Sequence, residues 1–303
     1  AARCTPFEVE ELPQCNGTPT VELEHVHSVY ERIARSWHGT RYKAWPRVEA
    51  FARTLPRGSL VADVGAGNGK NLPACTWTGV GNAAGPSFPI ASDLSLELCK
   101  ICAERSYQVA AADVTRLPFR TGVFDAVLCI AVLHHLSTRA RREAACAECC
   151  RLLLPGGRAV FYAWAQEQEG TGAASAPAAS QAGGEAAAAA GGYSGHRFPT
   201  QDVLVPFHVP LHCVDDPAIR ELANAQPGVP AVAVSAAAAG GACHGAYDPV
   251  KRSVVFQRYC HVYCRGELES LFDPLVAAGE VAVEQSWYDC GNWCAVAVRL
   301  PPR

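Results

Sequence analysis

Hydrophobic positions along the chain follow two different periods. Between residues 22 and 55 apolar residues recur every three to four positions, as in amphipathic helices, and Pro46 interrupts the pattern. From residue 59 onward, short apolar runs of strand length alternate with helix-like segments. The predicted strands are "SLVADVG" (59–65), "FPIASDLS" (88–95), "YQVAAADV" (107–114), "FDAVLCIAV" (124–132) and "GGRAVFYAW" (156–164). Strands that alternate with helices indicate an α/β fold with a parallel sheet covered on both faces.

The later part of the chain departs from this alternation. Two Ala/Gly-rich ranges, 166–195 and 223–246, lack large apolar side chains, and we interpret both as low-complexity surface insertions without fixed structure. The apolar segment 201–212 between them is expected to return to the body of the domain. A helix is predicted at 266–279, and "DCGN" (289–292) provides the turn of a C-terminal antiparallel hairpin. We expect one domain over residues 1–303, with a flexible segment at 1–20.

Composition and charge exclude few functions. Lys plus Arg number 26 against 29 Asp plus Glu, so net charge gives no argument for nucleic-acid or membrane binding. The 15 cysteines are an odd number, and several lie in apolar helix-like or strand-like runs, so we interpret them as reduced intracellular thiols. Two C-x-x-C pairs, Cys99 with Cys102 and Cys146 with Cys149, leave a structural metal as a minority alternative, and we predict no metal site. No run reaches the ~20 apolar residues of a membrane span.

A glycine-rich loop follows the first predicted strand in "LVADVGAGNGKNL" (60–72). A dinucleotide-binding loop needs G-x-G-x-x-G, which would require glycine at position 70, where this chain has Lys70. Gly65, Gly67 and Gly69 instead give D-x-G-x-G-x-G, which resembles the first motif of class I S-adenosylmethionine-dependent methyltransferases. Glycines in such a loop let the backbone approach the ligand where a Cβ atom would intrude. S-adenosylmethionine is therefore the expected cofactor.

Three aspartates lie at the ends of successive predicted strands. Ligands of open parallel sheets bind beyond the carboxyl ends of the strands. Asp63 is expected to serve the amino group of the ligand or to order the glycine loop, Asp93 to accept from the ribose hydroxyls, and Asp113 to accept from the adenine amine. Each aspartate alone is also a good turn or helix-cap residue. The predicted cofactor-binding residues are Asp63, Gly65, Gly67, Gly69, Asp93, Leu94, Asp113, Val114 and Ile130.

A narrower resemblance covers most of the chain apart from its first twenty residues and the two insertions. It is carried by "TRYKAWP" (40–46), "GAGNGKNL" (65–72), "IAVLHHLSTRARR" (130–142), "LLPGGRAVFYAWAQEQ" (153–168), "DVLVPF" (202–207), "RYCHVYCRGELESLF" (258–272) and "WYDCGNW" (287–293). Together these segments resemble the eukaryotic tRNA wobble-uridine carboxymethyl methyltransferases, which include the methyltransferase domain of the eighth AlkB homologue. The resemblance implies a Rossmann-like class I methyltransferase fold, with a seven-stranded, mostly parallel sheet and a C-terminal antiparallel hairpin.

The reaction implied by the resemblance is methyl transfer from S-adenosylmethionine to the carboxylate of 5-carboxymethyluridine at the tRNA wobble position. A carboxylate with a pKa near ~4 is already ionised at neutral pH, so it needs no general base. Basic side chains can position it, and aromatic side chains can stack on a splayed anticodon base. The catalytic candidates are His134, Arg41, Lys43, Arg258 and His261, and the substrate-binding candidates are Tyr42, His135, Trp164, Phe207 and Tyr259, with Trp293 as a further aromatic. For His135, helix capping or packing is an equal alternative.

Two partners follow from the same resemblance: the tRNA anticodon loop and a small zinc-binding methyltransferase activator protein. The strand predicted at 107–114 would be an edge strand, whose unpaired backbone groups suit strand addition by such an activator. The implied location is the cytoplasm, with the nucleus as an alternative, and no membrane partner is expected. Two other functions stay open, namely methylation of a small-molecule acid and cofactor binding without turnover. A dehydrogenase is disfavoured by Lys70.

Overall fold

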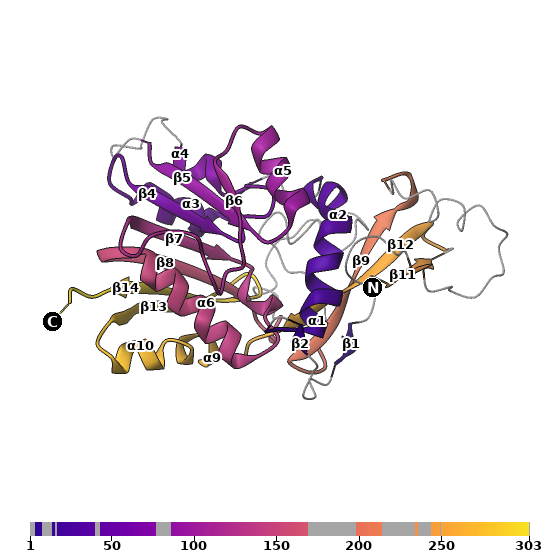
Figure 1. The fold of residues 1–303 in the computed structure, drawn as a ribbon. Helices are drawn as coiled ribbons and strands as arrows, with labels where there is room; N and C mark the ends of the chain where they lie inside the picture. Colours follow the sequence, from indigo (N-terminus) through magenta and orange to yellow (C-terminus); the bar gives the residue numbers. More distant parts are fainter. Residues whose placement is uncertain are drawn as a thin grey trace, which may run out of the picture.

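The large sheet of the protein contains seven strands: β4 (Leu60–Val64), β5 (Phe88–Asp93), β6 (Val109–Ala111), β7 (Phe124–Ile130), β8 (Leu153–Trp164), β13 (Val281–Asp289) and β14 (Asn292–Arg299). The computed structural model describes residues 4–7, 14–15, 17–39, 43–76, 86–168, 198–213, 234–235, 244–248 and 250–302. The strand order is β13-β14-β8-β7-β4-β5-β6 (Figure 1). The five strands from β4 to β8 pair in parallel, whereas β14 is antiparallel to β8 and β13. The predicted α/β sheet with its C-terminal hairpin is confirmed.

Apolar residues on both faces of the central strands explain why helices cover both sides of this sheet. In β7, Val127 and Cys129 belong to one buried cluster, while Ala126, Leu128 and Ile130 belong to another on the opposite face. This alternation follows from the two-residue period of a strand. Helix α6 (Arg139–Leu152) packs in the first cluster and α3 (Pro46–Arg53) in the second. A strand that is apolar on both faces is typical of a parallel sheet.

The helices begin where the sequence provides capping residues. Ser95 Oγ accepts from Leu98 N at 3.2 Å at the start of α5 (Leu96–Glu104), and Thr138 Oγ1 accepts from Arg141 N at 3.3 Å at the start of α6. The remaining short helices around the sheet are α4 (Leu72–Thr76), the 3₁₀ turn η2 (Leu133–His135), α9 (Glu267–Ser270) and α10 (Asp273–Ala277). The helix predicted within 266–279 is present as two short helices, α9 and α10. Pro274 has no N–H to donate and its ring clashes with the preceding turn, so the helix is split.

A second sheet lies beside the first and consists of β1 (Thr5–Pro6), β9 (Asp202–Pro210), β10 (Val234–Ser235), β11 (His244–Asp248) and β12 (Ser253–His261). Its order is β1-β9-β12-β11-β10, and its pairs are antiparallel. Strands β9 and β12 pair along their whole length, from Ser253 opposite Pro210 to His261 opposite Asp202. The sequence pattern predicts the return of segment 201–212 to the domain, but not this separate sheet. Leu211–Cys213 forms a 3₁₀ turn, η3, after β9.

An N-terminal helical arm fills the space between the two sheets (Figure 1). It comprises α1 (Thr20–Glu22), the π-helical η1 (Leu23–His27) and α2 (Ser28–His38). Its buried residues Val29 and Ile33 pack with Phe207 of β9 and Phe256 of β12, whereas Ala34 packs with α5 of the large-sheet unit. Within the amphipathic residues 22–55, α2 therefore contacts both the second sheet and α5 of the large-sheet unit, and in this way it connects the two sheets.

Several predicted boundaries differ from the structure. The third strand is shorter than the predicted 107–114, since β6 spans Val109–Ala111, and it lies at the sheet edge as expected. Within 1–20, β1 pairs with β9, and β2 (Gln14–Cys15) pairs with β3 (Thr18–Pro19), so these positions are placed in the fold. The range 223–246 contains β10 and the start of β11, contrary to an insertion without structure. The rest of both Ala/Gly-rich ranges, apart from 166–168, lies outside the described residues.

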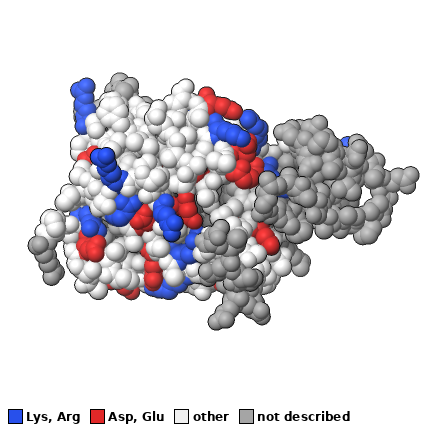
Figure 2. Space-filling view, in the orientation of Figure 1, with Lys and Arg blue, Asp and Glu red and all other residues white. Residues whose placement is uncertain are grey.

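Charge is mixed on the described part of the surface seen in Figure 2, where basic and acidic side chains lie interspersed and form no extended basic area. Local pairs account for part of this pattern, such as Arg35 with Glu104 and Arg139 with Glu143. Cys146 and Cys149 are buried in the core as free thiols. Among the described residues, no helix is long and apolar enough to cross a membrane.

Candidate cofactor and substrate pocket

A cavity of about 400 Å³ lies at the carboxyl ends of the parallel strands, where the sequence predicts the cofactor site. Its walls come from the loops after β4, β5, β6 and β7, from the N-terminal arm and from β8 and β12. The predicted cofactor residues that line it are Gly65, Gly67, Asp93, Leu94, Asp113, Val114 and Ile130. Asp63 and Gly69 are close in sequence to lining residues but do not line the cavity themselves. The predicted cofactor residues thus gather largely at one place.

The glycine loop follows β4 in a conformation that favours glycine. Gly65, Gly67 and Gly69 have φ values of +66°, +59° and +72°. A Cβ on Gly65 would lie 2.4 Å from Val132 Cγ2, and one on Gly67 would lie 2.6 Å from the Trp37 ring. Trp37 belongs to α2, so the arm is in contact with the loop. Glycine is required here both by the backbone angles and by the close approach of two neighbours.

Replacing Gly67 with alanine is expected to weaken S-adenosylmethionine binding about tenfold or more, because the left-handed backbone alone costs roughly 1–2 kcal/mol in an L-residue and the Trp37 ring must also move. Binding would be measured by isothermal titration calorimetry.

Gly58→Ala is the matched control, since Gly58 has φ +80° but no atom of the described residues lies within 4 Å of the added Cβ. This control variant has the energetic cost of a left-handed backbone in an L-residue but not the steric clash of the added Cβ. Equal loss of affinity in both variants would mean that the contact between Trp37 and the loop is unimportant.

Asp93 at the end of β5 organises the same loop. Its Oδ2 accepts from Gly67 N at 2.8 Å, and its Oδ1 accepts from Ser95 N at 3.0 Å. Burial raises the pKa of Asp93 to about 6, although these backbone N–H groups oppose the rise. The carboxylate is therefore ionised above this pH, at the cavity wall and close to the loop. Such a group is well placed to accept hydrogen bonds from ligand hydroxyls.

The contacts of Asp63 favour the second of its two predicted roles, which is to order the glycine loop. Its side chain is buried beneath the loop, and Asn71 Nδ2 donates to its Oδ1 at 3.5 Å. Oδ2 has no hydrogen-bond partner among the described residues, and burial raises the pKa of Asp63 to about 7. Because Asp63 does not line the cavity, it orders the loop from below rather than facing a ligand there. Lys70, the residue that breaks the dinucleotide pattern, lines the cavity with Nζ 4.5 Å from the Trp45 ring centroid.

Asp113 also lines the cavity and is held by its neighbours. Its Oδ1 accepts from Thr115 N and Oγ1, each at 2.8 Å, and its Oδ2 accepts from Arg141 Nη2 at 3.0 Å. Burial opposes ionisation, but the Thr115 and Arg141 hydrogen bonds outweigh it and lower the pKa of Asp113. Arg141 Nε also donates to Glu22 Oε2 at 2.9 Å. An ionised carboxylate is therefore fixed at the cavity wall. Arg141 connects this carboxylate to Glu22 of the N-terminal arm.

His134 lies on the side of the cavity nearest β8. Its ring stacks on Trp164, with centroids 4.9 Å apart and planes at 23°, and its Nδ1 accepts from the Trp164 backbone N–H at 3.4 Å. Burial, together with His135 and Arg258, lowers the pKa of His134 well below its ordinary value. The imidazole is thus neutral, with the proton on Nε2. His134 offers one neutral N–H donor at the cavity wall.

Both ring nitrogens of His135 form hydrogen bonds within the protein. Its Nδ1 is 2.9 Å from Tyr259 O and its Nε2 is 2.8 Å from Tyr30 Oη. Burial lowers the pKa of His135 to about 4, so the ring is neutral. A carbonyl oxygen only accepts, so Nδ1 donates to Tyr259 O, and Nε2 accepts from the Tyr30 hydroxyl. His135 is therefore better suited to support the wall than to bind substrate.

Arg258 of β12 brings a positive charge to the cavity wall. Its side chain is 1% exposed, and its Cζ lies 5.1 Å from the Phe207 ring centroid and 6.0 Å from that of Trp164. A guanidinium in such surroundings interacts with a bound anion more strongly than in water. Arg258 and His134 are the predicted catalytic candidates that the structure brings together at the cavity.

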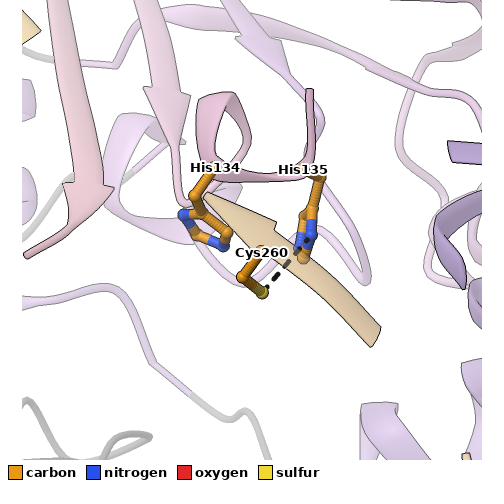
Figure 3. Close-up of side chains that lie close together, drawn as sticks. All are labelled: His134, His135 and Cys260. Atoms are coloured by element: carbon orange, nitrogen blue, oxygen red, sulfur yellow. Dashed lines mark hydrogen bonds between the residues drawn. The ribbon is translucent and has the colours of Figure 1, made fainter. Parts of the chain in front are cut away.

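Cys260 lies between His134 and His135 (Figure 3), and the three potential ligand atoms lie within 4.8 Å of one another. Metal binding would require a thiolate, but burial raises the pKa of the Cys260 thiol to about 12. It would also compete with the two hydrogen bonds of His135 and face the charge of Arg258. His134 and His135 form part of the polar wall of the cavity, and Cys260 contacts His135 without lining the cavity itself.

Other predicted residues lie elsewhere. His261, Tyr259 and Phe207 are not among the residues that line the cavity. Tyr259 Oη donates to Asp202 Oδ1, and Phe207 packs in the core below Arg258. Trp293 Nε1 donates to Glu167 Oε2 at 3.2 Å, and Lys43 is exposed and does not line the cavity. Arg41 and Tyr42 lie outside the described residues.

His261 sits between two carboxylates, with Nδ1 3.0 Å from Asp202 Oδ1 and Nε2 2.7 Å from Glu267 Oε1. Burial opposes its charge, but these partners outweigh burial and raise the pKa of His261. A pKa raised on folding stabilises the fold below the unfolded pKa, and this contribution is lost as pH rises through the folded pKa. We therefore expect the free energy of unfolding to fall between about pH 6 and about pH 8, and to fall less in His261→Gln. Urea unfolding at both pH values measures this; identical pH dependence in both proteins would contradict the ion-pair role.

The sequence pattern misses several residues of the cavity, many of them on the N-terminal arm. The amphipathic pattern predicts the arm as helical but does not say that the arm faces the glycine loop. Glu22 and Arg141 are far apart in the sequence, and no sequence pattern predicts that they form an ion pair. The missed lining residues include Glu22, Val26, His27, Tyr30, Glu31, Trp37, Trp45 and Arg141.

Comparison with known proteins identifies the family. Residues 62–161 match the family described as "Methyltransferase domain". The tRNA (carboxymethyluridine(34)-5-O)-methyltransferase of Schizosaccharomyces pombe is 32% identical over 277 residues, covering 91% of this chain and 96% of that protein. This chain belongs to the tRNA (carboxymethyluridine(34)-5-O)-methyltransferase family. The same name is carried by a Xenopus tropicalis protein, 36% identical over 94% of this chain, and by a Mus musculus protein, 34% identical over 92%.

The chain spans less than half the length of these two vertebrate relatives, 42% and 44% respectively. The CcbJ methyltransferase of Streptomyces caelestis has a similar structure, with a TM-score of 0.50, 10% identity and coverage of 93% of this chain and 99% of its own; this shows the fold alone. The cofactor of this methyltransferase domain is S-adenosylmethionine. The donor set of the cavity fits it: backbone of the glycine loop and the carboxylates of Asp93 and Asp113 line the wall.

Proposed function

We propose that this member of the tRNA (carboxymethyluridine(34)-5-O)-methyltransferase family transfers a methyl group from S-adenosylmethionine to the carboxylate of 5-carboxymethyluridine at position 34 of tRNA. The product would be the methyl ester. The observation that carries the proposal is the pairing of a methyl-donor pocket with a buried cation at its wall, Arg258, beside the neutral donor His134. A carboxylate substrate is the chemical group that such a wall suits best.

The glycine loop and the two aspartates would hold the cofactor. Gly65 and Gly67 line the cavity and would place their backbone beside the amino-acid part, Asp93 would accept from the ribose hydroxyls, and Asp113 would accept from the adenine amine. When bound, S-adenosylmethionine supplies an electrophilic methyl group. The ionised state of Asp113 and the neutral state of His134 fit their roles as acceptor and donor.

The protein's own part in the reaction is to bind and orient the substrate carboxylate. The attacking oxygen is already ionised at neutral pH, so no residue has to remove a proton. Arg258 would attract the carboxylate, and His134 Nε2–H would donate to one of its oxygens. A neutral donor holds that oxygen in line while reducing its nucleophilicity less than a second cation would. Apolar and aromatic walls, including Trp164 and Val132, would exclude water.

The partners of this reaction would be tRNA and a small zinc-binding methyltransferase activator. In support of the activator, β6 is the edge strand of the large sheet, with β5 as its partner among the described strands. Backbone groups on the other side of a short edge strand are suited to strand addition. We place the reaction in the cytoplasm or nucleus.

The proposal is tested by incubating the chain and the activator with S-adenosylmethionine labelled in the methyl group. Two tRNA samples differ only in the presence of 5-carboxymethyluridine at position 34. The expected result is label in the carboxymethylated tRNA alone, released by mild base because esters hydrolyse readily. Calorimetry on the same preparation measures cofactor binding.

Label that resists base, or label in both tRNAs, would contradict the carboxylate as acceptor. Cofactor binding without any transfer would favour a small-molecule acid or a protein that binds the cofactor without turnover. Free 5-carboxymethyluridine nucleoside, offered in a third reaction, separates these two outcomes.

A further inference from the structure

A chain of two hydrogen bonds links the N-terminal arm to the strand that carries Arg258. Tyr30 of α2 donates its hydroxyl proton to His135 Nε2 over 2.8 Å, and His135 Nδ1 donates to Tyr259 O over 2.9 Å. His135 belongs to η2 and Tyr259 to β12. Three elements that are distant in sequence are therefore joined by one imidazole.

The direction of this chain is fixed by its last acceptor. Tyr259 O cannot donate, so the Nδ1 proton of His135 points to it, and the neutral ring then leaves Nε2 as an acceptor. The Tyr30 hydroxyl is thus committed as a donor to His135. Each group has one compatible role, which makes the chain a specific connection rather than a general contact.

Both ends of the chain reach the walls of the pocket. Tyr259 lies between Arg258 and Cys260 on β12, so the bond to its carbonyl fixes the backbone next to the Arg258 side chain. At the other end the Tyr30 ring lies edge-on to Trp37, with centroids 6.0 Å apart, and Trp37 contacts Gly67 of the cofactor loop. Tyr30 itself lines the cavity.

We propose that Tyr30 is a positioning residue that acts through His135 to hold Arg258 of β12 in place for the substrate carboxylate. The inference rests on the proposed function. It assigns to the arm a role in the substrate half of the pocket, in addition to its contact with the cofactor loop. Because Tyr30 acts on orientation, it affects the reacting arrangement more than the binding of either ligand.

A purely structural role is distinguished by the pH dependence of His135. Without the Tyr30 hydroxyl, Nε2 loses the donor that favours the neutral ring, so the pKa of His135 rises from its low value. The groups that face this imidazole are Arg258 and Cys260 of β12, His134 of η2 and His27 of η1. A proton on His135 would place a second cation beside Arg258 and disturb the wall at mildly acidic pH.

The test compares wild type with Tyr30→Phe, which removes the hydroxyl and keeps the ring, in the full chain with the activator. We expect kcat for carboxymethylated tRNA to fall about tenfold, with KM for tRNA and Kd for S-adenosylmethionine changed by less than about twofold. The acid limb of kcat against pH should move to higher pH. His135→Asn, whose Nδ2 can replace Nδ1 but cannot reach Tyr30, should give the same loss, and the double variant no further loss.

A second measurement does not depend on turnover. Proton–nitrogen NMR of the histidine rings, with His135 assigned by its absence in His135→Asn, should show a neutral Nδ1–H ring that titrates at higher pH in Tyr30→Phe. Unchanged titration would overturn the inference, as would unchanged kcat or additive losses in the double variant. Absence of transfer by wild type would contradict the proposed function instead, and the NMR titration would still decide the role of Tyr30.

Discussion

Replacing Asp93 with alanine is expected to abolish measurable S-adenosylmethionine binding, with Kd raised about a hundredfold or more. The carboxylate accepts from Gly67 N and Ser95 N and lines the cavity, so its loss removes both a ligand acceptor and the support of the glycine loop. A hydrogen bond to a charged group contributes about 1.5–3 kcal/mol, and two such bonds to ribose hydroxyls account for this factor. Isothermal titration calorimetry at about pH 8 measures it.

Asp248→Ala is the matched control for this prediction. Asp248 Oδ1 also accepts from two backbone N–H groups, Val250 N at 3.0 Å and Lys251 N at 3.1 Å, but it lies at the end of β11 and does not line the cavity. Its loss should leave cofactor affinity unchanged. Normal binding by Asp93→Ala would show that the end of β5 does not hold the cofactor.

The pKa of Asp93 links binding to stability. Its folded pKa, raised by burial from 3.8 to about 6, means that its contribution to stability is fully present below 3.8 and is lost as pH rises through about 6. In the unliganded protein the ionised Asp93 carboxylate therefore lowers the stability of the fold. Hydrogen bonds from the ribose hydroxyls would offset this loss. Cofactor affinity should accordingly weaken as pH falls below about 6, because the protonated carboxyl accepts less well.

Local patterns in the sequence predict the large sheet and the cofactor half of the site. Parallel strands that are apolar on both faces give continuous runs such as 124–130, and ligand residues follow strand ends. Gly65, Gly67, Asp93 and Asp113 could therefore be placed without coordinates. The second sheet could not, because β9 and β12 are distant in sequence and nothing in either strand specifies the other as its partner.

For the substrate half of the site, the geometry of β12 could have refined the prediction made from the sequence. Side chains alternate across a strand, so Arg258 and His261, three positions apart in β12, point to opposite faces. Both cannot face the cavity. Arg258 and Cys260 take the cavity side, whereas Tyr259 and His261 face Asp202 on the other. The parity of the positions is visible in the sequence once β12 is recognised as one continuous strand.

Replacing Arg258 with methionine is expected to lower kcat/KM for carboxymethylated tRNA about a hundredfold, while Kd for S-adenosylmethionine stays within about twofold of wild type. Methionine fills a similar apolar space against Phe207 and Trp164 and removes the charge. A buried charge paired with a substrate carboxylate contributes several kcal/mol in transition-state binding, and about 3 kcal/mol corresponds to this factor. Single-turnover transfer of labelled methyl groups measures it. Arg258→Lys, which keeps the charge as a single point, should recover part of the loss.

Arg120→Met is the matched control, because Arg120 is exposed and lies before β7, at the amino end of the sheet and away from the cavity. It should retain wild-type activity. If Arg258→Met binds the cofactor normally and still transfers methyl groups at the wild-type rate, the carboxylate must be held by other groups, and Arg258 would be a residue of the core between β9 and β12. If cofactor affinity falls along with activity, the cation acts on the whole pocket instead of the substrate half, and the separation of the two halves would be wrong.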